Sequence, residues 1–82
     1  MTAMISNSNV EIIRTKAASM GCRVTKVVGG RRHLKIYMRT DEGISFMVPV
    51  KNSRVDPHKL KGWTRQTINK MRKAAANEDT IR

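Results

Sequence analysis

Cysteine and aromatic residues are scarce in this chain of 82 residues, which contains one Cys, one Trp, one Tyr and one Phe. A single cysteine cannot form an internal disulfide, and Cys22 and the two histidines lack the spacing of a zinc site. We interpret Cys22 as a small buried hydrophobic residue. Three aromatic residues are too few for the multi-base stacking platform of an RNP-type sheet.

Acidic residues are also few, and carboxylates with metal-ligand spacing are missing. Asp41 and Glu42 are adjacent and Asp56 stands apart, so the acidic cluster of a two-metal nuclease is absent and we expect no metal or cofactor. Phosphate-binding, hydrolase and dinucleotide motifs are absent too. No apolar run approaches the ~18 residues of a membrane-spanning helix, and no signal peptide is recognisable. We therefore expect a cytoplasmic protein that does not span a membrane.

Positive charge is what the chain has in excess, with 17 Lys and Arg against 6 Asp and Glu and a net charge of +11. In so short a chain this charge is self-repelling unless an anionic partner neutralises it. Nucleic acid is the commonest partner of this kind, an acidic protein the second and a membrane surface the least favoured. A fold that grips a nucleic-acid backbone by shape is favoured over one that reads unstacked bases.

The apolar pattern predicts one domain over residues 1–82, with frayed ends at about 1–7 and 78–82. Ser8 and Glu11 form a capping box, and Gly21 is placed to end the helix that follows. The predicted elements are a helix over 9–20, strands over 22–28, 31–40 and 44–50, and a helix over 63–77 that follows a polar, basic loop. This order predicts an α+β fold, α-β-β-β-α, with a three-stranded antiparallel sheet and two helices on one face.

The stretch VVGGRRHLKIYMR, residues 27–39, combines a turn with an alternating strand. Gly29 and Gly30 are predicted to supply the two positive-φ positions of a two-residue hairpin turn. Beyond the turn, every second residue is apolar and is expected to face the core. The residues expected on the open face of the sheet are Arg31, His33, Lys35, Tyr37 and Arg39. This face is predicted to meet RNA, with DNA as an open alternative.

Candidate site residues follow from this face and from the basic loop. The predicted nucleic-acid-binding residues are Arg31, Arg32, Lys35, Tyr37, Arg39, Lys51, Arg54, Lys59 and Lys61. His33 is the candidate catalytic residue, because nearby cations can hold a phosphate while the imidazole moves a proton. The alternative, that His33 is an ordinary surface residue, stays open, and we favour it for His58. Tyr37 is suited equally to stacking and to plain exposure, whereas Trp63 is expected in the core.

Short motifs add a family resemblance over about residues 8–76. Gly21, then Gly29-Gly30-x-x-His33, then Phe46-Met47-Val48-Pro49 and Gly62, in this order of elements, resemble the HicA-type mRNA interferase toxins and small phage or prophage proteins of similar layout. The resemblance implies a fold like that of double-stranded-RNA-binding domains and metal-independent cleavage of mRNA by His33. It also implies an acidic antitoxin protein as partner. A non-catalytic nucleic-acid-binding or host-interaction module on the same fold remains the alternative.

Overall fold

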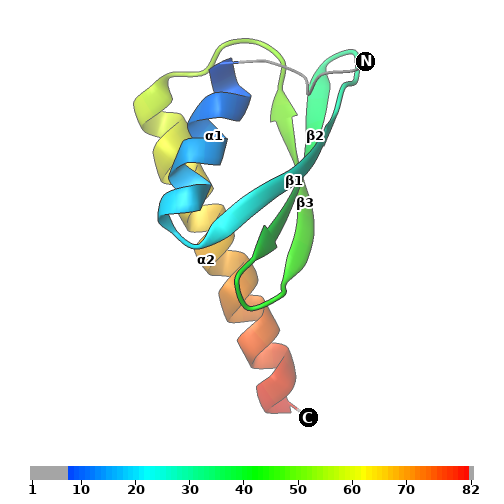
Figure 1. Cartoon of the computed structure of the whole chain (residues 1–82), viewed down its shortest axis with the longest axis vertical. Coiled ribbons are helices and arrows are strands. Elements are labelled where there is room, and N and C mark those ends of the chain that lie inside the picture. The colour runs from blue at the N-terminus through cyan, green and yellow to red at the C-terminus, as the bar shows by residue number, and fades with distance from the viewer. Residues whose placement is uncertain (1–7, 82) are drawn as a thin grey trace.

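The computed structural model describes residues 8–81, with side chains described through residue 76, and confirms the predicted order α-β-β-β-α. The elements are α1 (Ser8–Ser19), β1 (Cys22–Val28), β2 (His33–Thr40), β3 (Ser45–Lys51) and α2 (Pro57–Ile81). The strands form one antiparallel sheet in the order β1-β2-β3. Both helices lie on the same side of this sheet (Figure 1). The predicted frayed segment 1–7 lies outside the described residues.

Helix α1 and its termination agree with the sequence pattern. Val10, Ile13 and Ala17, spaced by three and four residues, are all fully buried. Gly21 has a φ of 70°, the left-handed conformation that commonly ends a helix and that glycine adopts without strain. Its carbonyl accepts a hydrogen bond of 2.9 Å from the Asp41 amide, which joins the end of α1 to the turn between β2 and β3.

The connection between β1 and β2 corrects the predicted hairpin turn. It spans residues 29–32, and the positive-φ glycines of the described chain are Gly21 and Gly43, not Gly29 or Gly30. Gly30 is needed for a different reason, because a Cβ there would lie 2.6 Å from the backbone oxygen of His33. Strand β2 therefore begins at His33, and the prediction that Arg31 belongs to the strand is wrong.

Helix α2 is longer than predicted at both ends. It begins at Pro57 because the Asp56 carboxylate accepts a hydrogen bond of 3.3 Å from the His58 amide, which caps the first turn. Gly62 lies inside the helix, where a Cβ would meet no atom within 4 Å, and so it does not break it. His58 is therefore in the first helical turn, not in a loop. No helix within residues 8–81 is both long enough and apolar enough to span a membrane.

The hydrophobic core lies between the inner side of the sheet and the two helices. Its buried members are Val10, Ile13, Ala17, Cys22, Leu34, Ile36, Met38, Val48, Val50, Leu60 and Ile68. Trp63 packs against this cluster, as expected. Burial raises the pKa of the Cys22 thiol above its ordinary value, which favours the neutral form and fits a packing role. Strand β3 pairs only with β2, so Pro49 lies on an edge strand, where a missing amide donor is tolerated.

Candidate nucleic-acid interface

The side of the sheet that faces away from the helices remains open. Along β2, buried and exposed residues alternate without exception, which confirms the parity predicted from the sequence. We call this side the outer face. Its positions are Arg23, Lys26 and Val28 on β1, His33, Lys35, Tyr37 and Arg39 on β2, and Ser45, Met47, Pro49 and Lys51 on β3. None of the three strands contains an Asp or Glu, although Asp41 in the turn after β2 lines a hollow with Arg23 and Arg39 at one end of the face.

A β-bulge in β1 decides which of its residues join the outer face. The pairing with β2 shifts between Val24 and Lys26, so Thr25 is the additional residue. Because of this shift, Lys26 lies opposite Tyr37, and both Val24 and Val27 pack against the core. The Thr25 hydroxyl donates a hydrogen bond of 3.2 Å to the Tyr37 carbonyl at the bulge. The bulge was not predicted from the sequence.

His33 lies at one end of the outer face, beside two cations. The sheet register pairs His33 with Lys51, although 18 residues separate them in the chain. Arg32, His33, Lys51, Asn52 and Ser53 line an open hollow of about 380 Å³. The ion pairs of the described residues join Arg14 to Glu11 and Arg72 to Glu42, and neither involves His33. The hollow therefore presents an imidazole among cations, an arrangement suited to a phosphate group.

Two asparagines, Asn9 and Asn52, join the segments that form this hollow, and neither was predicted as a site residue. The side-chain amide of Asn52 donates to the carbonyls of Gly30 and Arg31, each at 3.0 Å, and so ties the β1–β2 connection to the β3–α2 loop. Asn9, fully buried in the first turn of α1, donates to the carbonyls of Lys51 and Ser53 at 3.0 and 2.8 Å. Its Oδ1 accepts from the Val55 amide at 3.1 Å.

Only one of the two asparagines has a signal in the sequence. Asn9 precedes Ile13 by four residues, which places a polar side chain on the buried stripe of α1. A polar residue at such a position needs buried hydrogen-bonding partners. Asn52 lies in a polar loop, and its sequence context does not distinguish it.

The other predicted binding residues lie along β2, in the β3–α2 loop and on α2. Lys35 lies on β2 two residues from His33, and Tyr37 and Arg39 continue the row along the strand. Lys59, on α2, lines a separate groove of about 320 Å³ with Lys51, Leu60 and Trp63. Arg54 and Lys61 are exposed in the loop and on α2. The structure therefore groups Arg32, His33 and Lys51, and it places Tyr37 and Arg39 farther along the same face.

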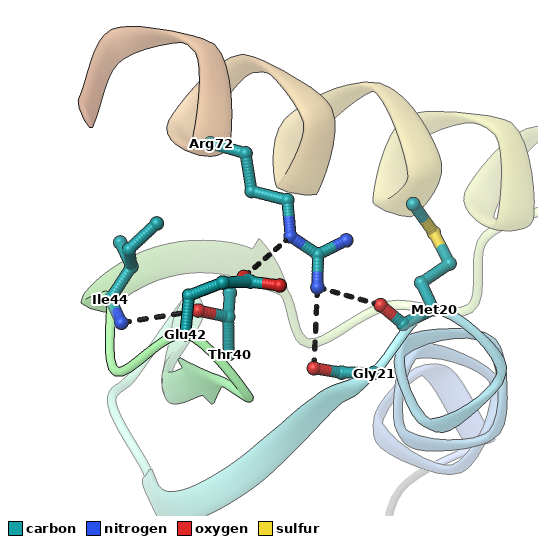
Figure 2. Close-up of polar contacts among 6 residues, drawn as sticks. All are labelled: Met20, Gly21, Thr40, Glu42, Ile44 and Arg72. Atoms are coloured by element: carbon teal, nitrogen blue, oxygen red, sulfur yellow. Dashed lines mark hydrogen bonds and ion pairs between the residues drawn. The ribbon is translucent and has the colours of Figure 1, made fainter. Parts of the chain in front are cut away.

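Arg72, on α2, is a basic residue whose contacts stabilise the fold. Its guanidinium donates to the carbonyls of Met20 and Gly21 at 2.8 and 3.3 Å, and to a carboxylate oxygen of Glu42 at 2.9 Å (Figure 2). These contacts neutralise the negative end of α1 and join it to the turn between β2 and β3. The charge of Arg72 is therefore used within the fold and is not part of the outer face.

The Arg72–Glu42 contact has a measurable consequence for pH dependence. The hydrogen bond from Arg72 lowers the pKa of the Glu42 carboxyl, so ionised Glu42 stabilises the fold above its ordinary pKa. This stabilisation is lost as the pH falls through the lowered value. Arg72→Gln is expected to return the pKa of Glu42, measured by NMR titration, toward its ordinary range. Arg65→Gln, an exposed change on the same helix, should leave this pKa unchanged, and equal values in all three proteins would contradict the assignment.

The described residues contain no group of three His, Cys, Asp or Glu side chains placed to hold a metal ion. Comparisons of the chain with protein-family models, curated proteins and solved structures found no match.

Proposed function

We propose that this protein binds RNA through the outer face of its sheet and the adjoining His33 hollow, in the cytoplasm. The observation that supports this is the charge of the face. Arg23, Lys26, Lys35, Arg39 and Lys51 share one side of a sheet whose strands contain no carboxylate, and none of the five takes part in the ion pairs of the described residues. A polyanion releases its counterions when it binds such a face, and that release favours association.

The salt dependence of binding tests this proposal. Replacing Arg32, Lys35 and Lys51 together by alanine removes three cations of this face and hollow. It is expected to weaken RNA binding and to flatten the slope of log K against log[salt] by about 2 to 3, since each phosphate contact contributes about 0.7 to 0.9. Fluorescence anisotropy with a labelled RNA, and with DNA of the same sequence, at several salt concentrations measures both quantities.

A matched control removes the same charge from another surface. The triple variant Arg65→Ala, Lys70→Ala, Lys73→Ala changes three exposed residues on α2. It should keep most of the wild-type slope. If both triple variants lose the same slope, the attraction is a property of net charge alone and the outer face is not the binding site.

Cleavage of the bound RNA is the second candidate function, supported by the position of His33 beside Lys51 and Arg32. In this scheme the imidazole takes the proton of a ribose 2′-hydroxyl, the 2′-oxygen bonds to the adjacent phosphorus, and the bond to the 5′-oxygen breaks. The departing 5′-oxygen receives a proton from the imidazolium or from water. Lys51 and Arg32 stabilise the additional charge on the phosphate oxygens.

The family resemblance adds a protein partner to this second candidate. A HicA-like ribonuclease toxin would be held inactive by an acidic antitoxin, and the cationic outer face offers the complementary charge. On the alternative reading, the same face serves a nucleic-acid-binding or host-interaction module without catalysis.

A further inference from the structure

The centre of the outer face is apolar, although its surroundings are cationic. Among the described residues, Tyr37 and Met47 are the large hydrophobic side chains left exposed, with 36% and 40% of their surfaces accessible. They lie directly opposite each other on β2 and β3. Together with Thr25, Arg39 and Ser45 they line an open depression of about 490 Å³. Exposure of an aromatic ring and an adjacent apolar side chain to water is unfavourable in free energy, and a ligand that covers both would remove this cost.

Cations surround this apolar centre on the strands next to it. Lys35 and Arg39 precede and follow Tyr37 by two residues on β2, so their side chains leave the face roughly 6 to 7 Å on either side of the ring. On β1, the Lys26 ammonium lies 5.8 Å from the centre of the Tyr37 ring. This separation is close to the limit of about 6 Å for a cation–π contact, so a flat ligand can displace the flexible lysine from the ring.

We infer that Tyr37 and Met47 receive an unpaired base of a single RNA strand, while Lys26, Lys35 and Arg39 hold the neighbouring phosphates. A duplex keeps its bases stacked inside and offers mainly its backbone and grooves, which would leave the apolar centre uncovered. An unpaired base supplies a flat π surface for Tyr37 and brings its own phosphates on both sides. Tyr37 is the one Tyr, Phe or Trp ring of the outer face, so it stacks one base and does not form a multi-base platform.

This inference rests on the proposed RNA binding and adds the class of RNA, an unpaired strand. The test compares a labelled single-stranded RNA of about 12 nucleotides with its matched duplex, at one salt concentration, for wild type, Tyr37→Leu and Tyr37→Phe. Wild type should prefer the single strand. Tyr37→Leu should lose between about fivefold and a hundredfold of single-strand affinity, the range typical of one base–aromatic stack. Tyr37→Phe, which keeps the ring, should bind the single strand with an affinity within about twofold of wild type.

Two further measurements distinguish the inferred base stacking from the proposed RNA binding on which it rests. Because Tyr37 is uncharged, Tyr37→Leu should leave the salt slope unchanged, whereas the Arg32, Lys35 and Lys51 triple variant flattens the slope. A wild type that prefers duplex, or a Tyr37→Leu protein that binds single strands as tightly as wild type, would overturn the stacking inference and leave RNA binding intact. A wild type that binds neither RNA would remove both. Equal melting temperatures of the variants establish that the fold is retained.

Discussion

Replacing Asn9 by alanine is expected to lower the free energy of unfolding by about 2 to 4 kcal/mol. The side chain is fully buried and makes three hydrogen bonds to the backbone of residues 51–55. Without it, the carbonyls of Lys51 and Ser53 and the amide of Val55 lose this partner. Each unsatisfied buried group costs about 1 to 3 kcal/mol, and because these bonds are only partly buried, water offsets part of the sum. Urea unfolding should show a lower midpoint with an unchanged slope, which indicates a change in stability and not in the surface exposed on unfolding.

Two variants serve as controls for Asn9→Ala. One tests whether the loss of side-chain volume explains the loss of stability, and the other removes exposed hydrogen bonds of the same loop. Asn9→Leu restores the volume but not the bonds, so it should remain destabilised. Asn52→Ala removes two hydrogen bonds from this loop to the β1–β2 connection, but these are exposed and water can replace them, so it should cost about 1 kcal/mol or less. If Asn9→Leu were as stable as wild type, packing and not hydrogen bonding would explain the contribution of Asn9 to stability.

Replacing His33 by alanine is expected to reduce RNA cleavage by about 10² to 10⁴, because a positioned acid or base contributes about this factor to a rate. RNA binding should persist, since Arg32 and Lys51 remain on either side of the hollow. Stability should change by less than about 0.5 kcal/mol, because the imidazole is exposed. The measurement is cleavage of several RNAs in excess EDTA by freshly folded wild type and His33→Ala.

His58→Ala supplies the matched control, since His58 is also exposed but lies in the first turn of α2. It should cleave as wild type does. Equal cleavage by wild type and His33→Ala would remove His33 from the mechanism, and cleavage that requires Mg²⁺ would refute the metal-free scheme. If wild type cleaves none of the RNAs, the protein is better described as a binding module, and the salt-dependence experiment then carries the functional assignment alone.

Periodicity along the chain was sufficient to predict much of the fold and which residues of β2 lie on the open face. The alternation on β2 predicted that His33, Lys35, Tyr37 and Arg39 point away from the core, because successive side chains of any strand point to opposite sides. The limits of β1 and the left-handed conformation of Gly21 were also predicted correctly, because each depends on residues adjacent in the sequence.

The errors came from glycines, whose role is ambiguous in sequence. Gly29-Gly30 matched a two-residue turn, yet Gly30 is required by the close approach of the His33 carbonyl. Gly62 resembled a helix boundary, yet Leu60 and Thr64 on either side are buried on one stripe of α2. A missing Cβ permits a left-handed φ, a close contact or a helical position, and the surrounding structure selects among them.

The grouping of the site residues was decided only by tertiary structure. Lys51 lies beside His33 because of the register between β2 and β3, and Lys26 lies over Tyr37 because a bulge shifts β1 by one residue. Asn9 and Arg72 bond to backbone groups more than 40 residues away in the chain. Such contacts depend on how separate elements pack and align, and local patterns of the sequence do not encode that alignment, whereas they do encode which side of each element is apolar.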